Sequence, residues 1–198
     1  MKKVLMAVFF CLLAVGILNL AADRETLKNQ VVRLHVVGAS DSEEDQAIKL
    51  QVRGGVLDSL KETMQDVTNA EEAKAFLTEN LAMIESAANR VLAEVGCGDT
   101  ASVTLQTEEF DTRVYDTFTL PAGLYDALRI TIGEGEGRNW WCVVFPSLCM
   151  PETTQGFADV AAGAGFSEEL TGTLTQDYEV RFFFLDLLGQ VENFFHRE

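Results

Sequence analysis

The segment VVRLHVVG, residues 31–38, followed by ASDSEEDQAIKL, residues 39–50, decides the fold of this chain. In its first part, apolar residues alternate with Arg33 and His35, which is the period of a β-strand with one polar face. In its second part, acidic residues crowd the start of an apolar pattern with helical spacing, as they do at a helix N-terminus. The chain is therefore predicted to pass from a strand directly into a helix.

That helix is predicted over residues 42–64, because Ser40 and Glu43 have the spacing of a capping box. Its interior contains Gly54 and Gly55. Each glycine costs about 1 kcal/mol relative to alanine inside a helix, so the pair indicates a bend or a close approach to another element.

A second helix is predicted to start after Thr68 and Glu71, again at capping-box spacing. Its apolar residues recur at steps of three and four, and Gly96 ends it. These two helices are the predicted N-terminal helical layer of the domain.

Beyond the second helix the apolar residues change to period two. The change is seen in SVTLQTEEF at 102–110, LYDALRITI at 124–132 and WWCVVF at 140–145. GEGEGRN at 133–139 joins the last two strands and is predicted to be a hairpin loop, and VRFFFLDLLGQVENFF at 180–195 to run from strand into helix. The sequence thus predicts one α+β domain, with a mainly antiparallel sheet of about four to five strands packed against two long N-terminal helices, plus a C-terminal strand/helix segment.

The N-terminus has the three parts of an export signal. Met1, Lys2 and Lys3 precede an uncharged apolar run over residues 4–18, and NLAAD follows at 19–23. The run is almost long enough to cross a bilayer, so an uncleaved anchor is the alternative to a cleaved signal. Residues 1–22 are predicted to be a signal peptide or N-terminal membrane anchor, and residues 23–198 a single exported domain.

The exported part is strongly acidic. The whole chain has 15 Lys and Arg against 31 Asp and Glu, a net charge of −16, and without Lys2 and Lys3 the net charge becomes −18. Such a charge repels nucleic acids and anionic lipid headgroups. We therefore expect no nucleic-acid partner, and membrane contact only through residues 1–22 if they are not cleaved.

Two sequence features resemble binding motifs but lack required residues, and catalytic signatures are missing. DSEEDQ at 41–46 has the acidic spacing of a calcium loop, but Gln46 replaces the glycine and Val52 the bidentate glutamate. GEGEG carries two glutamates where a phosphate loop would bind an anion. No hydrolase signature is present, and the only histidines are His35 and His196. We expect no catalytic residue, no metal and no cofactor.

NWWCVVFPSLC at 139–149 contains two cysteines outside any redox or zinc spacing. In an exported domain a Cys142–Cys149 disulfide is the better interpretation, which requires the chain to reverse near Pro146 and Ser147. Closing this eight-residue loop contributes about 2.5 kcal/mol. The alternatives are that Cys97 pairs with one of the two, or that all three stay reduced.

Trp140 and Trp141 are adjacent on a predicted strand, so their side chains point to opposite faces of the sheet. If one is exposed beside Arg138, it is the best anchor for a protein partner, because Trp and Arg dominate interface hot spots. The alternative is that a helix or the C-terminal segment covers it. Arg138, Trp140 and Trp141 are the predicted partner contacts.

The residues discussed above also resemble a known family. VVRLHVVGASDSEEDQAIKLQVRGGVL at 31–57 and LPAGLYDALRITIGEGEGRNWWCVVFPSLC at 120–149 are similar to stage II sporulation protein R of endospore-forming bacteria. Within these segments, Ser147 stands where a second proline is expected and His35 where arginine is common.

The resemblance implies a signalling protein made in the forespore and exported to the space between the forespore and mother-cell membranes. There it would trigger a membrane-embedded aspartic protease, stage II sporulation protein GA, which removes the pro-sequence of sigma-E. This implies a protein partner and no small-molecule substrate. The alternative is an exported hydrolase or a structural envelope protein of the sporulating cell.

Overall fold

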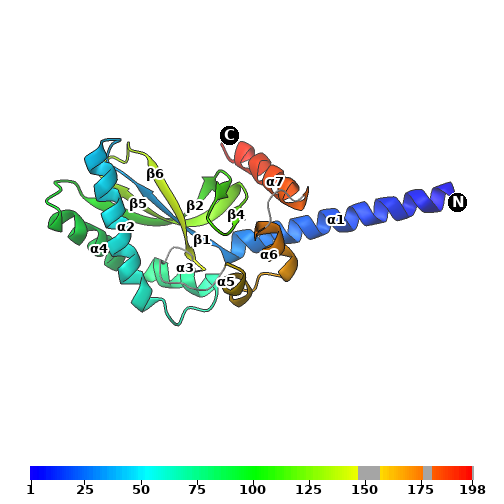
Figure 1. Ribbon diagram of the computed structural model, residues 1–198, viewed down its shortest axis with the longest axis horizontal. Helices are drawn as coiled ribbons and strands as arrows, with labels where there is room; N and C mark the ends of the chain where they lie inside the picture. Colours follow the sequence, from blue (N-terminus) through cyan, green and yellow to red (C-terminus); the bar gives the residue numbers. More distant parts are fainter. Residues whose placement is uncertain (147–156, 176–179, 198) are drawn as a thin grey trace.

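Figure 1 shows the computed structural model, which describes residues 1–146, 157–175 and 180–197. The elements in these residues are, in order, α1 (Lys2–Gln30), β1 (Val32–Val37), α2 (Glu43–Thr63), α3 (Ala70–Glu79), α4 (Leu81–Glu94), β2 (Ala101–Phe110), β3 (Arg113–Val114), β4 (Thr119–Leu120), β5 (Gly123–Ile132), β6 (Asn139–Phe145), α5 (Phe157–Gly163), α6 (Glu168–Thr175) and α7 (Val180–His196).

The centre of the domain is a four-stranded sheet with the strand order β2-β5-β1-β6. β5 pairs antiparallel with β2 and parallel with β1, and β6 pairs antiparallel with β1. The sheet is mixed, with two antiparallel pairings and one parallel pairing, and the predicted α+β class with a mainly antiparallel sheet is confirmed. β3 and β4 form a separate antiparallel ladder, which the sequence patterns do not predict.

The predicted hairpin between β5 and β6 is wrong. The two strands are not neighbours, because β1 lies between them and pairs with both. The loop over residues 133–138 therefore crosses the end of β1. Local periodicity identifies the two strands but carries no information about a third strand that comes from far away in the sequence.

Helices cover both faces of this sheet (Figure 1). α2, α3 and α4 pack on the first face, around an aliphatic core that includes Leu34 of β1 and Leu128 of β5. α1, α5, α6 and α7, together with β3 and β4, pack on the second face, around a core richer in aromatic residues. The polar face predicted for β1 is consequently buried, and Arg33 and His35 are only 0% and 3% exposed.

Side-chain caps fix where α2 and α3 begin. Ser42 caps α2 by accepting a hydrogen bond from the backbone N–H of Asp45 at 3.0 Å, so the cap lies two residues beyond the predicted Ser40. Asn69 caps α3 in the same way, through the N–H of Glu72 at 2.9 Å. The predicted region of each helix start is confirmed, but the capping residue is different.

The second predicted helix is divided into α3 and α4 at Asn80. The Asn80 side chain donates a hydrogen bond to the carbonyl oxygen of Phe76 at 2.8 Å, and so competes with the regular helical pattern. Apolar spacing continues across this break, which is why periodicity predicts a single helix. α4 crosses α2 at Gly55, where a Cβ atom would strike the side chain of Val91. The predicted close approach is confirmed at this glycine.

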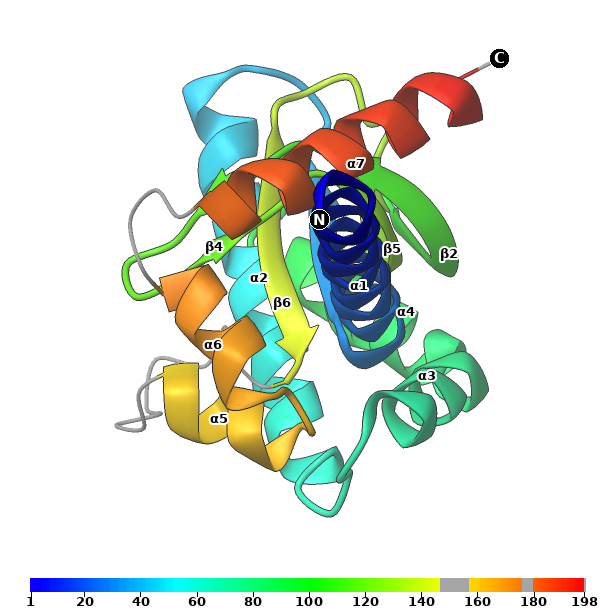
Figure 2. The ribbon, with the colours of Figure 1, turned by 90° about the vertical axis from the view of Figure 1, so that its right-hand side faces the viewer.

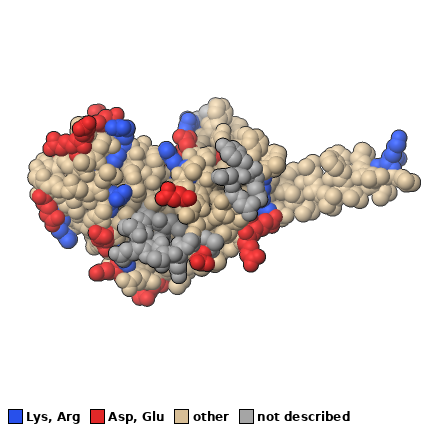
Figure 3. All heavy atoms as spheres, in the orientation of Figure 1, with Lys and Arg blue, Asp and Glu red and all other residues tan. Residues whose placement is uncertain are grey.

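α1 extends from Lys2 to Gln30 without interruption (Figure 1). Its first part projects away from the domain, and Figure 3 shows this projecting part without charged side chains except at its free end. Its last turns pack into the domain, where Asp23, Arg24 and Leu27 are buried. The predicted division of the chain at residue 22 lies inside this helix and stays a prediction.

The C-terminal segment is helical where the structure describes it. Residues 180–196 form α7, so the predicted start of this segment as a strand is wrong. The apolar pattern of this segment fits either a strand or a helix. The segment is a helix in the fold, where it packs against α1 and β5.

Candidate functional site

The predicted contact residues lie at the start of β6, which is an edge strand of the sheet. The 133–138 loop brings the chain to this edge by crossing the end of β1. Its backbone is bonded there, because the N–H of Gly137 donates to the carbonyl oxygen of Gly38 at 2.9 Å. A Cβ atom at Gly137 would overlap the backbone of Ser40, so this crossing requires glycine. The glycine-rich loop thus has a structural role in joining the inner strand β5 to the edge strand β6.

Arg138 is held by its backbone while its side chain faces solvent. Its N–H donates to the carboxylate of Asp41 at 2.7 Å, and its carbonyl oxygen accepts from Lys49 Nζ at 2.7 Å. The Arg138 side chain is 70% exposed and lies 3.6 Å from Asp41. Burial lowers the pKa of Lys49, and the charge of Arg138 lowers it further. The acidic start of α2 therefore fixes where the Arg138 guanidinium is presented.

Trp140 faces the first side of the sheet. It packs against the aliphatic core, and the guanidinium of Arg53 lies 4.6 Å from the centre of its ring. The side chain is partly exposed. Trp140 is therefore an edge residue of the first core, with one part of the indole in contact with apolar side chains and another in contact with water.

Trp141 faces the second side, as the alternation of a strand requires. Its ring stacks on His35 with centroids 3.8 Å apart, contacts Phe110 edge to face at 5.0 Å, and has the guanidinium of Arg113 at 5.2 Å. It is also partly exposed. The predicted opposite orientation of the two tryptophans is thus observed, and each indole is partly covered by an arginine and by the core.

A buried polar pair lies beneath Trp141. His35 Nδ1 is 2.6 Å from Oε2 of Glu108, and Oε1 of the same carboxylate accepts hydrogen bonds from Arg129 and Gln106. Burial alone raises the pKa of Glu108, but these hydrogen bonds outweigh it and the pKa is lowered. Glu108 therefore carries its negative charge within the domain, where it fixes the imidazole against which Trp141 stacks.

The arrangement suits protein docking better than bond-making chemistry. An exposed guanidinium and two partly exposed indoles lie within four residues of one strand edge, and these groups are the most effective anchors in protein interfaces. Among the residues that the structure describes, no group of three or more His, Cys, Asp or Glu could hold a metal ion. We call Arg138, Trp140 and Trp141 the β6 edge site.

The predicted disulfide falls partly outside the described residues. Cys142 is disulfide-bonded, whereas Cys11 and Cys97 are free. Cys149 and Ser147 lie outside the described residues, so the pairing of Cys142 with Cys149 stays a prediction. The alternative in which Cys142 and Cys97 pair with each other does not agree with the free Cys97 thiol.

Several side chains that shape this site were not singled out by the sequence. Arg53 and Arg113 lie over the two indoles, and Glu108 fixes His35. All three are far from β6 in the sequence, so no local spacing signals their contacts. Asp41 and Lys49 belong to the acidic helix start that the sequence does identify, but their bonds to Arg138 depend on the loop crossing that it does not.

The N-terminal helix has the length and composition of a membrane-spanning segment. The most apolar 18-residue window of α1 has a mean hydropathy of 2.6 and none of it is buried. A signal sequence has the same properties, so this observation is compatible with both the predicted signal peptide and the predicted anchor.

Comparison with known proteins identifies the family. The family model of stage II sporulation protein R matches residues 28–155, which include β1 to β6. Stage II sporulation protein R of Bacillus subtilis (strain 168) is 33% identical over 167 residues, covering 79% of this chain and 75% of the relative. No solved structure matches the chain. This protein therefore belongs to the stage II sporulation protein R family.

Proposed function

We propose that this protein is an exported signalling protein of endospore formation that activates a membrane-embedded aspartic protease, stage II sporulation protein GA. The activated protease would remove the pro-sequence of sigma-E in the mother cell. Family membership carries this proposal, since it assigns the protein a role in sporulation. The chain would act from the space between the forespore and mother-cell membranes, to which residues 1–22 would direct it.

The mechanism we propose is a shift of population. The exported domain binds the outer face of the protease more tightly in its active state than in its inactive state, and so favours the active state by that difference in affinity. The β6 edge site supplies the contact. The backbone of Arg138 is fixed by Asp41 and Lys49, so no backbone conformational entropy has to be lost at this residue when it meets a partner.

Co-expression in a non-sporulating host tests this function. The full chain, the protease and pro-sigma-E are produced together, and the shortening of pro-sigma-E is followed by immunoblot. A matched control carries Leu12→Arg and Leu13→Arg, which interrupt the apolar run of α1 in its projecting, exposed part and leave the domain unchanged.

The proposal expects shortening with the natural chain and none with the control that is not exported. If pro-sigma-E stays uncut with all three proteins correctly located, or if the control is equally active, the proposal is wrong. A chain that instead loses activity only on substitution of one carboxylate or of Cys97 would behave as the alternative, an exported hydrolase.

A further inference from the structure

α7 presents a continuous apolar surface to its surroundings. Eight large apolar residues on this helix are 41% to 74% exposed and recur at steps of three and four, so they form one stripe along its length. We call them the outer stripe: Val180, Phe183, Phe184, Leu187, Leu188, Val191, Phe194 and Phe195. At 100° per residue the stripe is centred opposite the buried residues Leu185, Gly189 and Asn193. The helix therefore has two contact faces, one used by the domain and one unused in the described residues.

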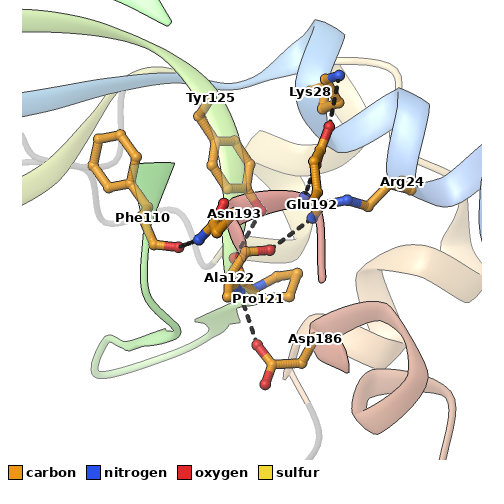
Figure 4. A network of polar contacts seen from close by, with 9 residues as sticks. All are labelled: Arg24, Lys28, Phe110, Pro121, Ala122, Tyr125, Asp186, Glu192 and Asn193. Atoms are coloured by element: carbon orange, nitrogen blue, oxygen red, sulfur yellow. Dashed lines mark hydrogen bonds and ion pairs between the residues drawn. The ribbon is translucent and has the colours of Figure 1, made fainter. Parts of the chain in front are cut away.

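Polar contacts fix α7 in this orientation (Figure 4). Asp186 accepts a hydrogen bond from the N–H of Ala122 at 2.8 Å, and Asn193 donates to the carbonyl oxygen of Phe110 at 2.9 Å. At Gly189 the helix lies against the backbone of Ala122 so closely that a Cβ atom would overlap the carbonyl oxygen. The helix cannot rotate its outer stripe into the core without breaking these contacts.

The same helix is joined to α1 at the point where α1 enters the domain. Glu192 forms ion pairs with Arg24 and with Lys28, the second at 3.0 Å, and Arg181 donates to Asp23 at 2.9 Å. Figure 2, viewed along α1 from its free end, shows α7 lying across this helix on the side from which α1 projects. The outer stripe thus lies next to the exposed apolar part of α1.

We propose that the outer stripe rests in the surface of the lipid bilayer that α1 enters. A 17-residue helix is about 25 Å long, and amphipathic helices of this kind bury their apolar face about 5–10 Å deep at the boundary between headgroups and acyl chains. The occupant is a bilayer because α1 is apolar and long enough to cross one, and α7 meets α1 where that apolar part ends.

Apolar burial, not charge, drives this contact. The chain has a net charge of −16, which opposes attraction to anionic headgroups, and Arg181 and Glu192 of α7 are used in pairs with α1. We therefore expect binding to electrically neutral lipid. The contact extends the membrane-facing part of the chain beyond residues 1–22. It is independent of the proposed function, since α7 lies outside the residues that the family model matches.

Depth-dependent fluorescence quenching on the full chain tests the proposal. Cys11→Ser and Cys97→Ser remove the free thiols, and Leu187→Cys then carries a fluorophore that reports on polarity. The matched control carries the label at Asp58→Cys, an exposed residue of α2, and Figure 1 shows this helix away from the projecting part of α1. Both proteins are reconstituted in phosphatidylcholine vesicles with and without acyl chains brominated near the headgroup.

At position 187 we expect blue-shifted emission that brominated lipid quenches about twofold, and at position 58 water-like emission without quenching. A second variant with Phe184→Asp and Val191→Asp should lose the quenching at 187, and because both positions are exposed it should keep its unfolding temperature. Water-like emission at 187 would overturn the proposal. So would blue-shifted emission that lipid does not quench, which would assign the stripe to a second copy or another protein.

Discussion

The two faces of the central sheet are covered in different ways. On the first face the core is built from aliphatic side chains of α2, α3 and α4, with Lys49 and Trp140 at its edge. On the second face the core is aromatic, and Arg33, Arg24 and Asn193 are buried within it. The first face is held mainly by apolar packing, with polar contacts at its rim such as Lys74 with Asp126 and Asn89 with the backbone of Ala101. The second also contains buried polar pairs, which fix α7 against α1.

The largest loss of stability is expected on the first face. Leu60 is 0% exposed, so Leu60→Ala removes buried methyl groups and leaves a cavity. We expect the free energy of unfolding in urea to fall by about 2–5 kcal/mol. The matched control is Leu50→Ala on the same helix, because Leu50 is 44% exposed and its removal should cost little. Equal losses at the two positions would contradict the description of this core.

The disulfide comes next. If Cys142 pairs with Cys149, Cys142→Ser should lower the free energy of unfolding by about 2.5 kcal/mol under oxidising conditions. The natural chain provides a second check. When it is unfolded and alkylated without reduction, intact-mass measurement should show two added groups, at Cys11 and Cys97. Four added groups before reduction would disprove the disulfide.

A smaller, pH-dependent loss is expected on the second face. Burial raises the pKa of Glu192, but hydrogen bonds from Arg24 and Lys28 outweigh this effect and the pKa is lowered. A lowered pKa in the folded state stabilises the protein at pH values above the ordinary glutamate pKa of about 4.3, and this contribution is lost as the pH falls through the folded-state pKa. Glu192→Gln should therefore cost about 1–2 kcal/mol at pH 7 and progressively less below pH 4.

The control for this pH effect is Glu25→Gln. Glu25 is an exposed residue of α1 that bonds only to the nearby Asn29 among the described residues. Thermal unfolding of both variants at pH 7 and pH 3 separates the two cases. A difference between the Glu192 variant and the natural chain that does not shrink at pH 3 would show that the Glu192 carboxylate is not the stabilising group.

The smallest effect is expected where the second face contains a buried charge. Burial lowers the pKa of Arg33, whose guanidinium bonds to the Tyr115 hydroxyl at 2.7 Å and lies 4.0 Å from the ring of Phe110. Its Nε and Nη1 atoms have no hydrogen-bond partner in the described residues. Arg33→Met has a similar shape without the charge, so the unfolding temperature should stay equal or rise. A clear fall would mean that the charge itself stabilises this face.

The first face is the part of the fold that the sequence predicts well. Its helices carry apolar residues at regular steps, and its strands alternate, so periodicity identifies nearly every element. Errors appear where a contact is distant in sequence. β1 enters between β5 and β6 and so removes the predicted hairpin. The break at Asn80 depends on one side-chain bond to Phe76, which the apolar pattern does not register.

The second face is predicted poorly, and the reason is physical. Its polar residues look like a solvent-facing strand surface in β1, but Arg33 and His35 are buried. Their partners are Tyr115 and Glu108, which lie far from β1 in the sequence. The candidate site shows the same limit. Alternation correctly places Trp140 and Trp141 on opposite faces, whereas the stacking of Trp141 on His35 and the fixing of His35 by Glu108 require the folded sheet.

The most direct test of the account is photo-crosslinking from the β6 edge site to the protease. A photoreactive amino acid replaces Asn139, the exposed neighbour of Arg138 at the start of β6, in the exported full chain, in cells that also produce the protease and pro-sigma-E. A second chain carries it at Asp58, on the exposed face of α2. We expect a crosslinked product with the protease from position 139 and none from position 58, in cells where pro-sigma-E is shortened. Shortening without a crosslink from position 139, or with an equal crosslink from both positions, would contradict docking through this edge.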